Sequence, residues 1–182
     1  MNVIAIVGLE SIKDANGNVK YHADTFLNNI RTWHRDNPKA ALKTLDGRDY
    51  MNGDNPIKAL WADMASAYGD KGIDQIIYSG HSDSEKLYWI SKSRHDLSDD
   101  VKFISDNDWP FIFNKDACIR IAGCQAGGQR GVKWPKCVAQ TIANKSKIIV
   151  WAFTSRSSQQ QRNGGYYQTP DIGGYVEFIP SH

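Results

Sequence analysis

The segment IDQIIYSGHSD, residues 73–83, is a short apolar run that ends in Ser-Gly-His, with His81 at its exit. The segment CIRIAGCQAGG, residues 118–128, has the same pattern and ends in Gly-Cys, with Cys124 at its exit. Short apolar runs without helical spacing are typical of strands that are buried on both faces of a parallel sheet. The two segments therefore predict two buried strands, each of which ends in a reactive side chain.

Further apolar runs lie on either side of these segments and alternate with helical patterns. Four more strands are expected at Val3–Val7, Ala41–Leu45, Ile148–Phe153 and Tyr175–Ile179. One helix is expected to begin at a cap formed by Asp24, a second at a cap formed by Asn55, and another is expected to open with Pro135, because these residue types favour the first positions of a helix. Strands that alternate with helices predict an α/β fold: a three-layer α-β-α sandwich with a mostly parallel six-strand sheet.

The length of 182 residues predicts one domain, residues 1–182. The irregular stretch 86–114 is interpreted as an insertion above the sheet, with a small hairpin arm at Leu87–Ile90. The stretch Thr154–Gly174 is polar and rich in Gln and Gly, and is expected to be a loop.

Composition excludes several classes of protein. The 22 basic and 20 acidic residues are spread along the chain, so no basic patch predicts binding to a nucleic acid. No apolar stretch reaches the roughly 20 residues of a membrane span, and the first residues do not form a classical signal peptide. Three cysteines without CxxC spacing favour a reducing compartment. We expect a cytoplasmic protein, or one that is exported without a classical signal peptide.

The two strand exits bring together the groups of a cysteine nucleophile. Neighbouring strands lie about 5 Å apart, so His81 and Cys124 can meet if their strands are adjacent. An imidazole favours the thiolate, and a carbonyl under attack needs backbone N–H donors for its developing oxyanion. We expect the amides of Ser82 and Cys124 to form that oxyanion hole. This chemistry needs no metal and no organic cofactor.

The order of strand, Ser-Gly-His, crossover, strand, Gly-Cys, helix and strand resembles the caspase-like, clan CD cysteine peptidases, which include clostripain-like enzymes and CHAT domains. The resemblance covers Val3 to Phe153 in element order, while only YSGHSD and IAGCQAGG match at the level of motifs. It implies a caspase-hemoglobinase fold, a peptide or protein substrate, His81 as the catalytic histidine and Cys124 as the nucleophile. The chain departs from the family at Ser82, where Gly is usual, and at Ala122, where a polar specificity residue is frequent.

Charged residues after the strands give opposite predictions of substrate specificity. The resemblance implies that Thr154–Ser158 form part of the wall of the S1 pocket, which binds the side chain before the cleaved bond. In this wall, Arg156 would select an acidic side chain. Glu10 and Asp83 would select a basic one, because burying an unmatched charge costs several kcal/mol. We expect a basic residue before the cleaved bond, bound by Glu10 or Asp83.

Two other functions fit the same residues. The fold could serve as a non-catalytic caspase-like binding module with an idle Cys124. Alternatively, Gly80–Ser84 nearly matches the G-x-S-x-G elbow of α/β-hydrolases, which would make Ser82 the nucleophile, although the last glycine and a following helix are missing.

A zinc site is not expected, because His81, Cys118, Cys124 and Cys137 lack the close pairs of typical zinc ligands. Cys118 and Cys137 are interpreted as inert thiols of the core, because cysteine is among the residue types that are most often buried.

Overall fold

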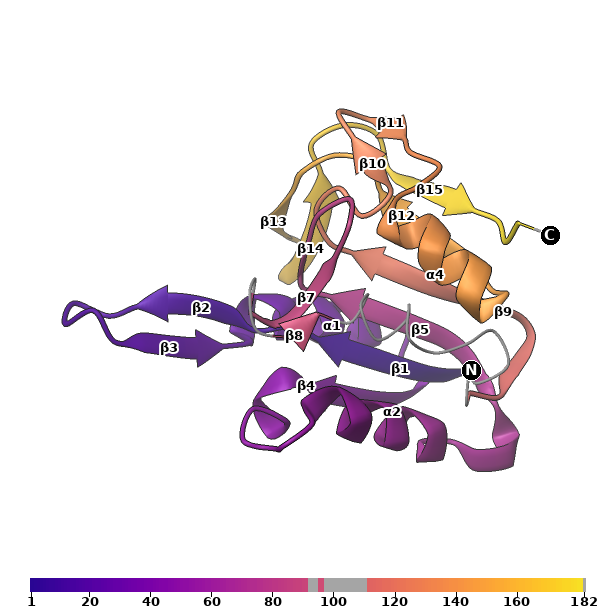
Figure 1. Ribbon diagram of the computed structural model, residues 1–182, viewed down its shortest axis with the longest axis horizontal. Coiled ribbons are helices and arrows are strands. Elements are labelled where there is room, and N and C mark those ends of the chain that lie inside the picture. Colours follow the sequence, from indigo (N-terminus) through magenta and orange to yellow (C-terminus); the bar gives the residue numbers. More distant parts are fainter. Residues whose placement is uncertain (92–94, 97–110, 182) are drawn as a thin grey trace.

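The computed structural model describes residues 1–91, 95–96 and 111–181, and its centre is one six-stranded sheet (Figure 1). All neighbouring strands pair in parallel, except that β15 is antiparallel to β12. The chain is therefore a mixed α/β protein with a mostly parallel sheet, as the sequence predicts. Across the sheet the strands are β15 (Tyr175–Phe178), β12 (Ile149–Phe153), β9 (Phe113–Ala122), β5 (Ile73–Ser79), β1 (Asn2–Val7) and β4 (Ala41–Asp46).

Helices cover both faces of this sheet. In Figure 1, α2 (Pro56–Ser66) and α4 (Val138–Ser146) lie in front of the sheet, and α1 (Asp24–Asp36) lies behind it. Two short 3-10 turns, η1 (Gly47–Asp49) and η2 (Gly69–Lys71), flank α2 in the sequence. Within the described ranges, no helix combines the length and apolar character that crossing a membrane requires.

The helix starts confirm one prediction and correct two. Asn55 accepts a hydrogen bond from the Lys58 N–H and precedes Pro56 in the first turn of α2, as predicted. Asp24 is the first residue of α1 instead of its cap. The helix expected to open at Pro135 is α4, which begins at Val138: the Cys137 sulfur caps it by accepting the Gln140 N–H, and the Val138 N–H is donated to the carbonyl of Ser84.

The stretch expected to be a polar loop folds as a β-hairpin. Strands β13 (Ser157–Arg162) and β14 (Gly165–Pro170) pair over their whole length. The turn between them is Asn163-Gly164, and both residues have positive φ, 49° and 68°. Two-residue turns with positive φ at both positions favour Asn-Gly, because their twist matches that of paired strands. The loop prediction was wrong, although the sequence carried this signal.

The residues after His81 form a second small sheet of β6 (His81–Ser82), β7 (Leu87–Ser91) and β8 (His95–Asp96). The predicted hairpin arm is present, but it belongs to the core: Trp89 is fully buried, and its carbonyl accepts the Leu9 N–H at 2.7 Å. Residues 92–94 and 97–110, the middle of the predicted insertion, lie outside the described residues. Two further hairpins are β2 (Glu10–Lys13) with β3 (Val19–His22), and β10 (Gly128–Gln129) with β11 (Val132–Lys133).

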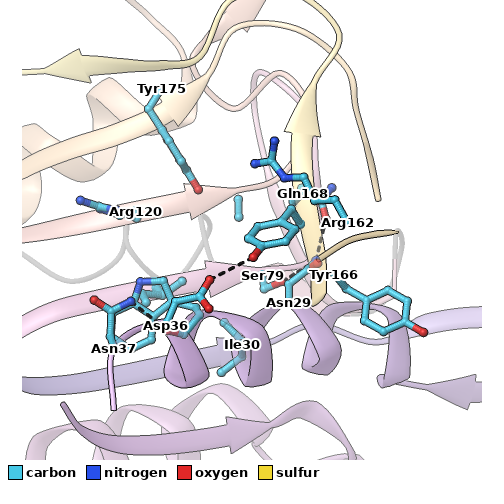
Figure 2. A pocket seen from close by; sticks show the side chains of 14 residues that line it. Asn29, Ile30, Asp36, Asn37, Ser79, Arg120, Arg162, Tyr166, Gln168 and Tyr175 are labelled. Carbon is cyan, nitrogen blue, oxygen red and sulfur yellow. Dashed lines mark hydrogen bonds between the residues drawn. The ribbon is translucent and has the colours of Figure 1, made fainter. Parts of the chain in front are cut away.

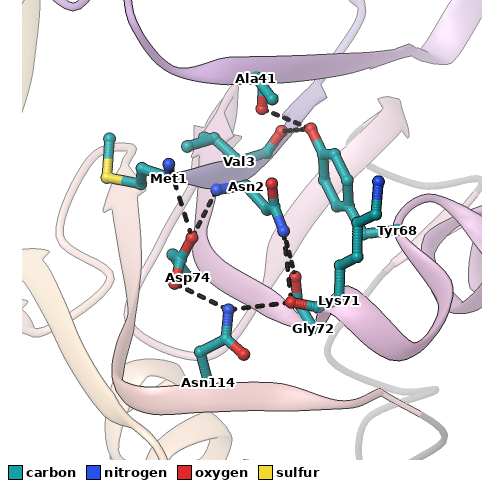
Figure 3. Close-up of polar contacts among 9 residues, drawn as sticks. All are labelled: Met1, Asn2, Val3, Ala41, Tyr68, Lys71, Gly72, Asp74 and Asn114. Atoms are coloured by element: carbon teal, nitrogen blue, oxygen red, sulfur yellow. Dashed lines mark hydrogen bonds and ion pairs between the residues drawn. The ribbon is translucent and has the colours of Figure 1, made fainter.

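A network of hydrogen bonds connects the central strands of the sheet at their amino-terminal ends (Figure 3). The Asp74 carboxylate accepts the backbone N–H of Asn2 and, at 2.8 Å, the side-chain amide of Asn114. The Asn2 side chain in turn donates to the carbonyl of Gly72 at 2.9 Å. These bonds connect the starts of β1, β5 and β9, the three strands at the centre of the sheet.

The Asp74→Asn substitution tests this network through pH. The bond from the Asn2 N–H, supported by Asn114, lowers the pKa of the Asp74 carboxyl below its usual value. The stability that this carboxylate contributes is therefore present above the unfolded pKa of about 3.9 and is lost as the pH falls through the folded value. We expect the variant to be less stable than the wild type at pH 7, with a difference that shrinks below about pH 4. Urea denaturation over a pH series measures it, with exposed Asp70→Asn as control; a difference independent of pH would contradict the account.

Candidate active site

The register of the central strands places His81 and Cys124 at the same edge of the sheet. Ser79 of β5 pairs with Ala122 of β9, and each reactive residue follows two positions later. The predicted adjacency of these two strands is confirmed. A direct bond joins the two exits: the Ser82 hydroxyl donates to the carbonyl oxygen of Cys124 at 2.7 Å. The loops that carry the candidate histidine and cysteine are thus in contact.

Gly123 makes this contact possible. A Cβ atom at this position would lie 2.2 Å from the Ser82 Oγ and 3.1 Å from the carbonyl oxygen of Gly80. Only a residue without a side chain leaves room for the two exits to approach. The glycine before the cysteine is therefore a steric requirement of the site.

His81 is held between a carboxylate and an aromatic ring. Its Nε2 lies 3.7 Å from Oε1 of Glu10, which is within ion-pair distance when the imidazole is protonated and is too long for a hydrogen bond. The ring meets Phe26 edge to face, with centroids 5.0 Å apart. The other oxygen of Glu10, Oε2, accepts the Thr25 hydroxyl at 3.2 Å. The first turn of α1 therefore fixes both the histidine and the acid beside it.

The contact between Glu10 and His81 was not predicted from the sequence. The sequence suggested that Glu10 binds a substrate side chain, whereas in the structure its carboxylate faces His81. Asp83, the other acidic candidate, is engaged in its own hairpin. Its Oδ1 accepts the N–H groups of Glu85 and Lys86, and its Oδ2 accepts the Tyr88 hydroxyl at 2.6 Å. These bonds favour a structural role for Asp83.

The Cys124 thiol is partly exposed and lies against the start of β13. The Ser157 N–H is directed at the sulfur at 3.4 Å, and the Ser157 hydroxyl lies at the same distance. The Cys124 thiol is also placed to donate to the carbonyl oxygen of Ser157, at 3.6 Å. The Ser157 hydroxyl accepts from Gln168 at 2.8 Å, and Gln168 accepts from Asn29 of α1 at 3.0 Å. Sequence reasoning missed this support, because it did not identify the hairpin that supplies Ser157 and Gln168.

The other two thiols lie elsewhere. Cys137 caps α4 and is 1% exposed, and this burial raises its pKa. Cys118 lies on β9, where Gln75 donates to its sulfur at 3.5 Å. In the described part of the chain, no three His, Cys, Asp or Glu side chains gather in a way that could hold a metal ion.

Two cavities flank the segment around Cys124. One, of about 280 Å³, lies between α1 and the β13–β14 hairpin and reaches Ser79, Ala122 and Gln168 (Figure 2). The other, of about 390 Å³, is lined by residues next to Cys124 and by Arg156. Arg156 therefore lines a cavity that also reaches Gln125, the residue after Cys124.

Comparison with known proteins returned no match to a family model and none to a curated protein. A function must therefore be argued from the geometry of the site.

The pair Gly123→Ala and Ser82→Gly tests the steric requirement between the two exits. We expect Gly123→Ala to lower the free energy of unfolding by about 1–3 kcal/mol, the usual cost of overpacking. In the Ser82→Gly background, the same change should cost less, because the atoms that the new Cβ meets first are gone. Urea denaturation of the double-mutant cycle measures the coupling. Gly174→Ala is the matched control, since its Cβ would meet nothing within 4 Å; equal costs of Gly123→Ala in both backgrounds would refute the contact.

Proposed function

We propose that this chain is a cysteine endopeptidase in which His81 activates the thiol of Cys124. The observation that supports it most directly is the meeting of the two strand exits, which are in register and joined by the Ser82–Cys124 hydrogen bond. The acid beside His81 and the N–H directed at the sulfur add the two supports that such a pair needs. The resemblance to caspase-like peptidases agrees with this proposal.

In the proposed reaction, His81 takes the proton of the Cys124 thiol, and the sulfur attacks the carbonyl carbon of a peptide bond. The tetrahedral intermediate collapses to a thioester as His81 returns the proton to the leaving amine. His81 then takes a proton from water, which attacks the thioester; the acid product leaves and the thiol is restored. No step requires a metal or an organic cofactor.

The backbone of β6 offers a donor for the oxyanion. In the β6–β7 pair, Asp83 donates its N–H to the carbonyl of Lys86 at 3.0 Å. Because hydrogen-bonded positions alternate in an antiparallel pair, the N–H of the preceding residue, Ser82, is directed away from β7. In the proposed mechanism this N–H and that of Cys124 stabilise the oxyanion, so that the Ser82 side chain is not required for the chemistry.

Glu10 is proposed as a positioning residue. During the reaction His81 becomes an imidazolium, and a carboxylate 3.7 Å from its Nε2 stabilises that charge. The same contact, together with Phe26, restricts the orientation of the ring. Glu10 acts through His81 in this proposal and does not contact the substrate.

The structure offers less support to the serine alternative. Ser82 is 9% exposed, and its hydroxyl is donated to the Cys124 carbonyl. A strand, β7, follows it, whereas the nucleophile elbow of a hydrolase is followed by a helix. The binding-module alternative predicts a Cys124 thiol without unusual reactivity, which is measurable.

Digestion of a mixed peptide library by the wild type and by single variants tests the proposed function. Cys124→Ala should abolish turnover, and His81→Ala should reduce kcat/KM by about 10²–10⁴-fold, the range for loss of a general base. Glu10→Gln should reduce kcat with little change in KM, because it acts on the histidine. Ser82→Ala separates the two candidate nucleophiles. Only the Ser82 N–H takes part in the cysteine chemistry, so this variant should keep more activity than His81→Ala, although it loses the hydrogen bond between the two exits. Cleavage that persists in Cys124→Ala and is lost in Ser82→Ala would contradict the proposal and favour the hydrolase.

A further inference from the structure

Part of the back of the central sheet has no helix of its own. Behind the sheet, α1 packs on β1 and β5, whereas α4 packs on β12 and β15 from the front (Figure 1). Of the helices in the described chain, α2 also lies in front, which leaves β9, β12 and β15 without a helix behind them. Parallel strands are usually covered on both faces, because both faces carry apolar side chains. We refer to the back of these three strands as the open face.

Strand register identifies the side chains of the open face. Residues that pair in register point to the same face of a sheet, as do alternate residues of one strand. Arg120 of β9 lines two cavities that α1 also borders, one of them shown in Figure 2, so it points to the back of the sheet. It pairs with Trp151 of β12, which pairs in turn with Glu177 of β15. The other large side chains of this face on β12 and β15 are Ile149, Phe153 and Tyr175.

The open face combines exposed apolar side chains with two unpaired charges. Ile149 and Tyr175 are 37% and 39% exposed, and the half-buried Trp151 lies between Arg120 and Glu177. Within the described ranges, neither of these two charged side chains lies within 4.0 Å of an oppositely charged group. Contiguous apolar surface with a polar rim marks an interaction site, and tryptophan and arginine are typical of the centre of such sites.

The charges on this face are self-complementary. Consider two copies whose open faces meet, with a two-fold axis between them that runs parallel to β12 through Trp151. This axis exchanges the sides of β9 and β15, so that Arg120 of each copy faces the partner's Glu177. A two-fold axis perpendicular to the strands would instead set each charge against its own kind. A two-fold interface requires a surface that complements itself, and the row of Arg120, Trp151 and Glu177 meets this requirement.

We propose that the open face joins two copies of this chain in a symmetric homodimer, in which Arg120 of each copy pairs with the partner's Glu177. Sheets that pack face to face lie about 10 Å apart, and the side chains of the two inner faces fill the space between them. Each copy thus supplies the layer that the other lacks behind β9, β12 and β15. A second copy is favoured over a different protein because the charges of this row complement themselves. The inference is independent of the proposed peptidase function.

Charge reversal tests the proposal with the full chain, by sedimentation velocity over a concentration series. We expect the wild type to sediment as a dimer. Arg120→Glu and Glu177→Arg should each raise the dimer Kd at least about tenfold, because like charges would then face each other twice across the interface. An equimolar mixture of the two variants should recover the dimer, since every pair in the mixed complex is again of opposite charge. Asp70→Arg is the control: it changes the charge as Glu177→Arg does, but at an exposed site on η2, and should remain a homodimer.

Recovery in the mixture separates loss of the interface from loss of the fold, because a misfolded variant would not regain a dimer on mixing. Circular dichroism of each single variant provides a second check of folding. A wild type that stays monomeric throughout the series would overturn the proposal and leave the open face to a different partner. A dimer that both reversals leave unchanged would place the interface elsewhere on the molecule. Loss of the dimer in both single variants without recovery in their mixture would contradict the two-fold pairing of Arg120 with Glu177.

Discussion

The parallel pairing of β5 with β9 is the constraint on which the rest of the site depends. Its register sets Ser79 opposite Ala122, so that the chain leaves both strands at the same level. A shift of one residue in either strand would reverse the face of every side chain beyond it. The Ser82–Cys124 hydrogen bond stabilises this alignment of the two strand exits, and the absence of a side chain at Gly123 leaves room for it. The reactivity proposed for Cys124 is thus a consequence of strand register before it is a property of the thiol.

Two elements outside the central pair orient the reactive groups. The first turn of α1 supplies Phe26 to the histidine ring and Thr25 to the acid beside it. The β13–β14 hairpin brings Ser157 to the sulfur, and its Gln168 connects back to Asn29 of the same helix. One helix therefore supports both members of the proposed dyad.

The sequence predicted the parts of this structure that follow from local patterns. Apolar runs identified all six strands of the central sheet, and the Asn55-Pro56 pair identified the start of α2. The partner of Glu10 could not be predicted, because the turn of the chain into the β2–β3 hairpin, and not any local signal, brings that carboxylate to His81. The β13–β14 hairpin was missed for a different reason: its first strand, SSQQQR, shows no apolar alternation, so the Asn163-Gly164 turn was its only strong signal. The roles of Ser82 and Ser157 depend on side-chain contacts between distant segments, which a single sequence does not encode in any readable pattern.

The central claim is that His81 makes Cys124 a nucleophile, and the alkylation rate of each cysteine in the folded protein tests it most directly. Iodoacetamide reacts with the thiolate, so at neutral pH the rates report activation of each thiol, and mass spectrometry of the digested protein assigns them to individual residues. The account predicts that Cys124 is alkylated much faster than Cys118 and Cys137, the latter slowed by its burial and raised pKa, and that His81→Ala removes this advantage. Equal rates at Cys124 and Cys118, or a fast rate at Cys124 that is unchanged in His81→Ala, would contradict it.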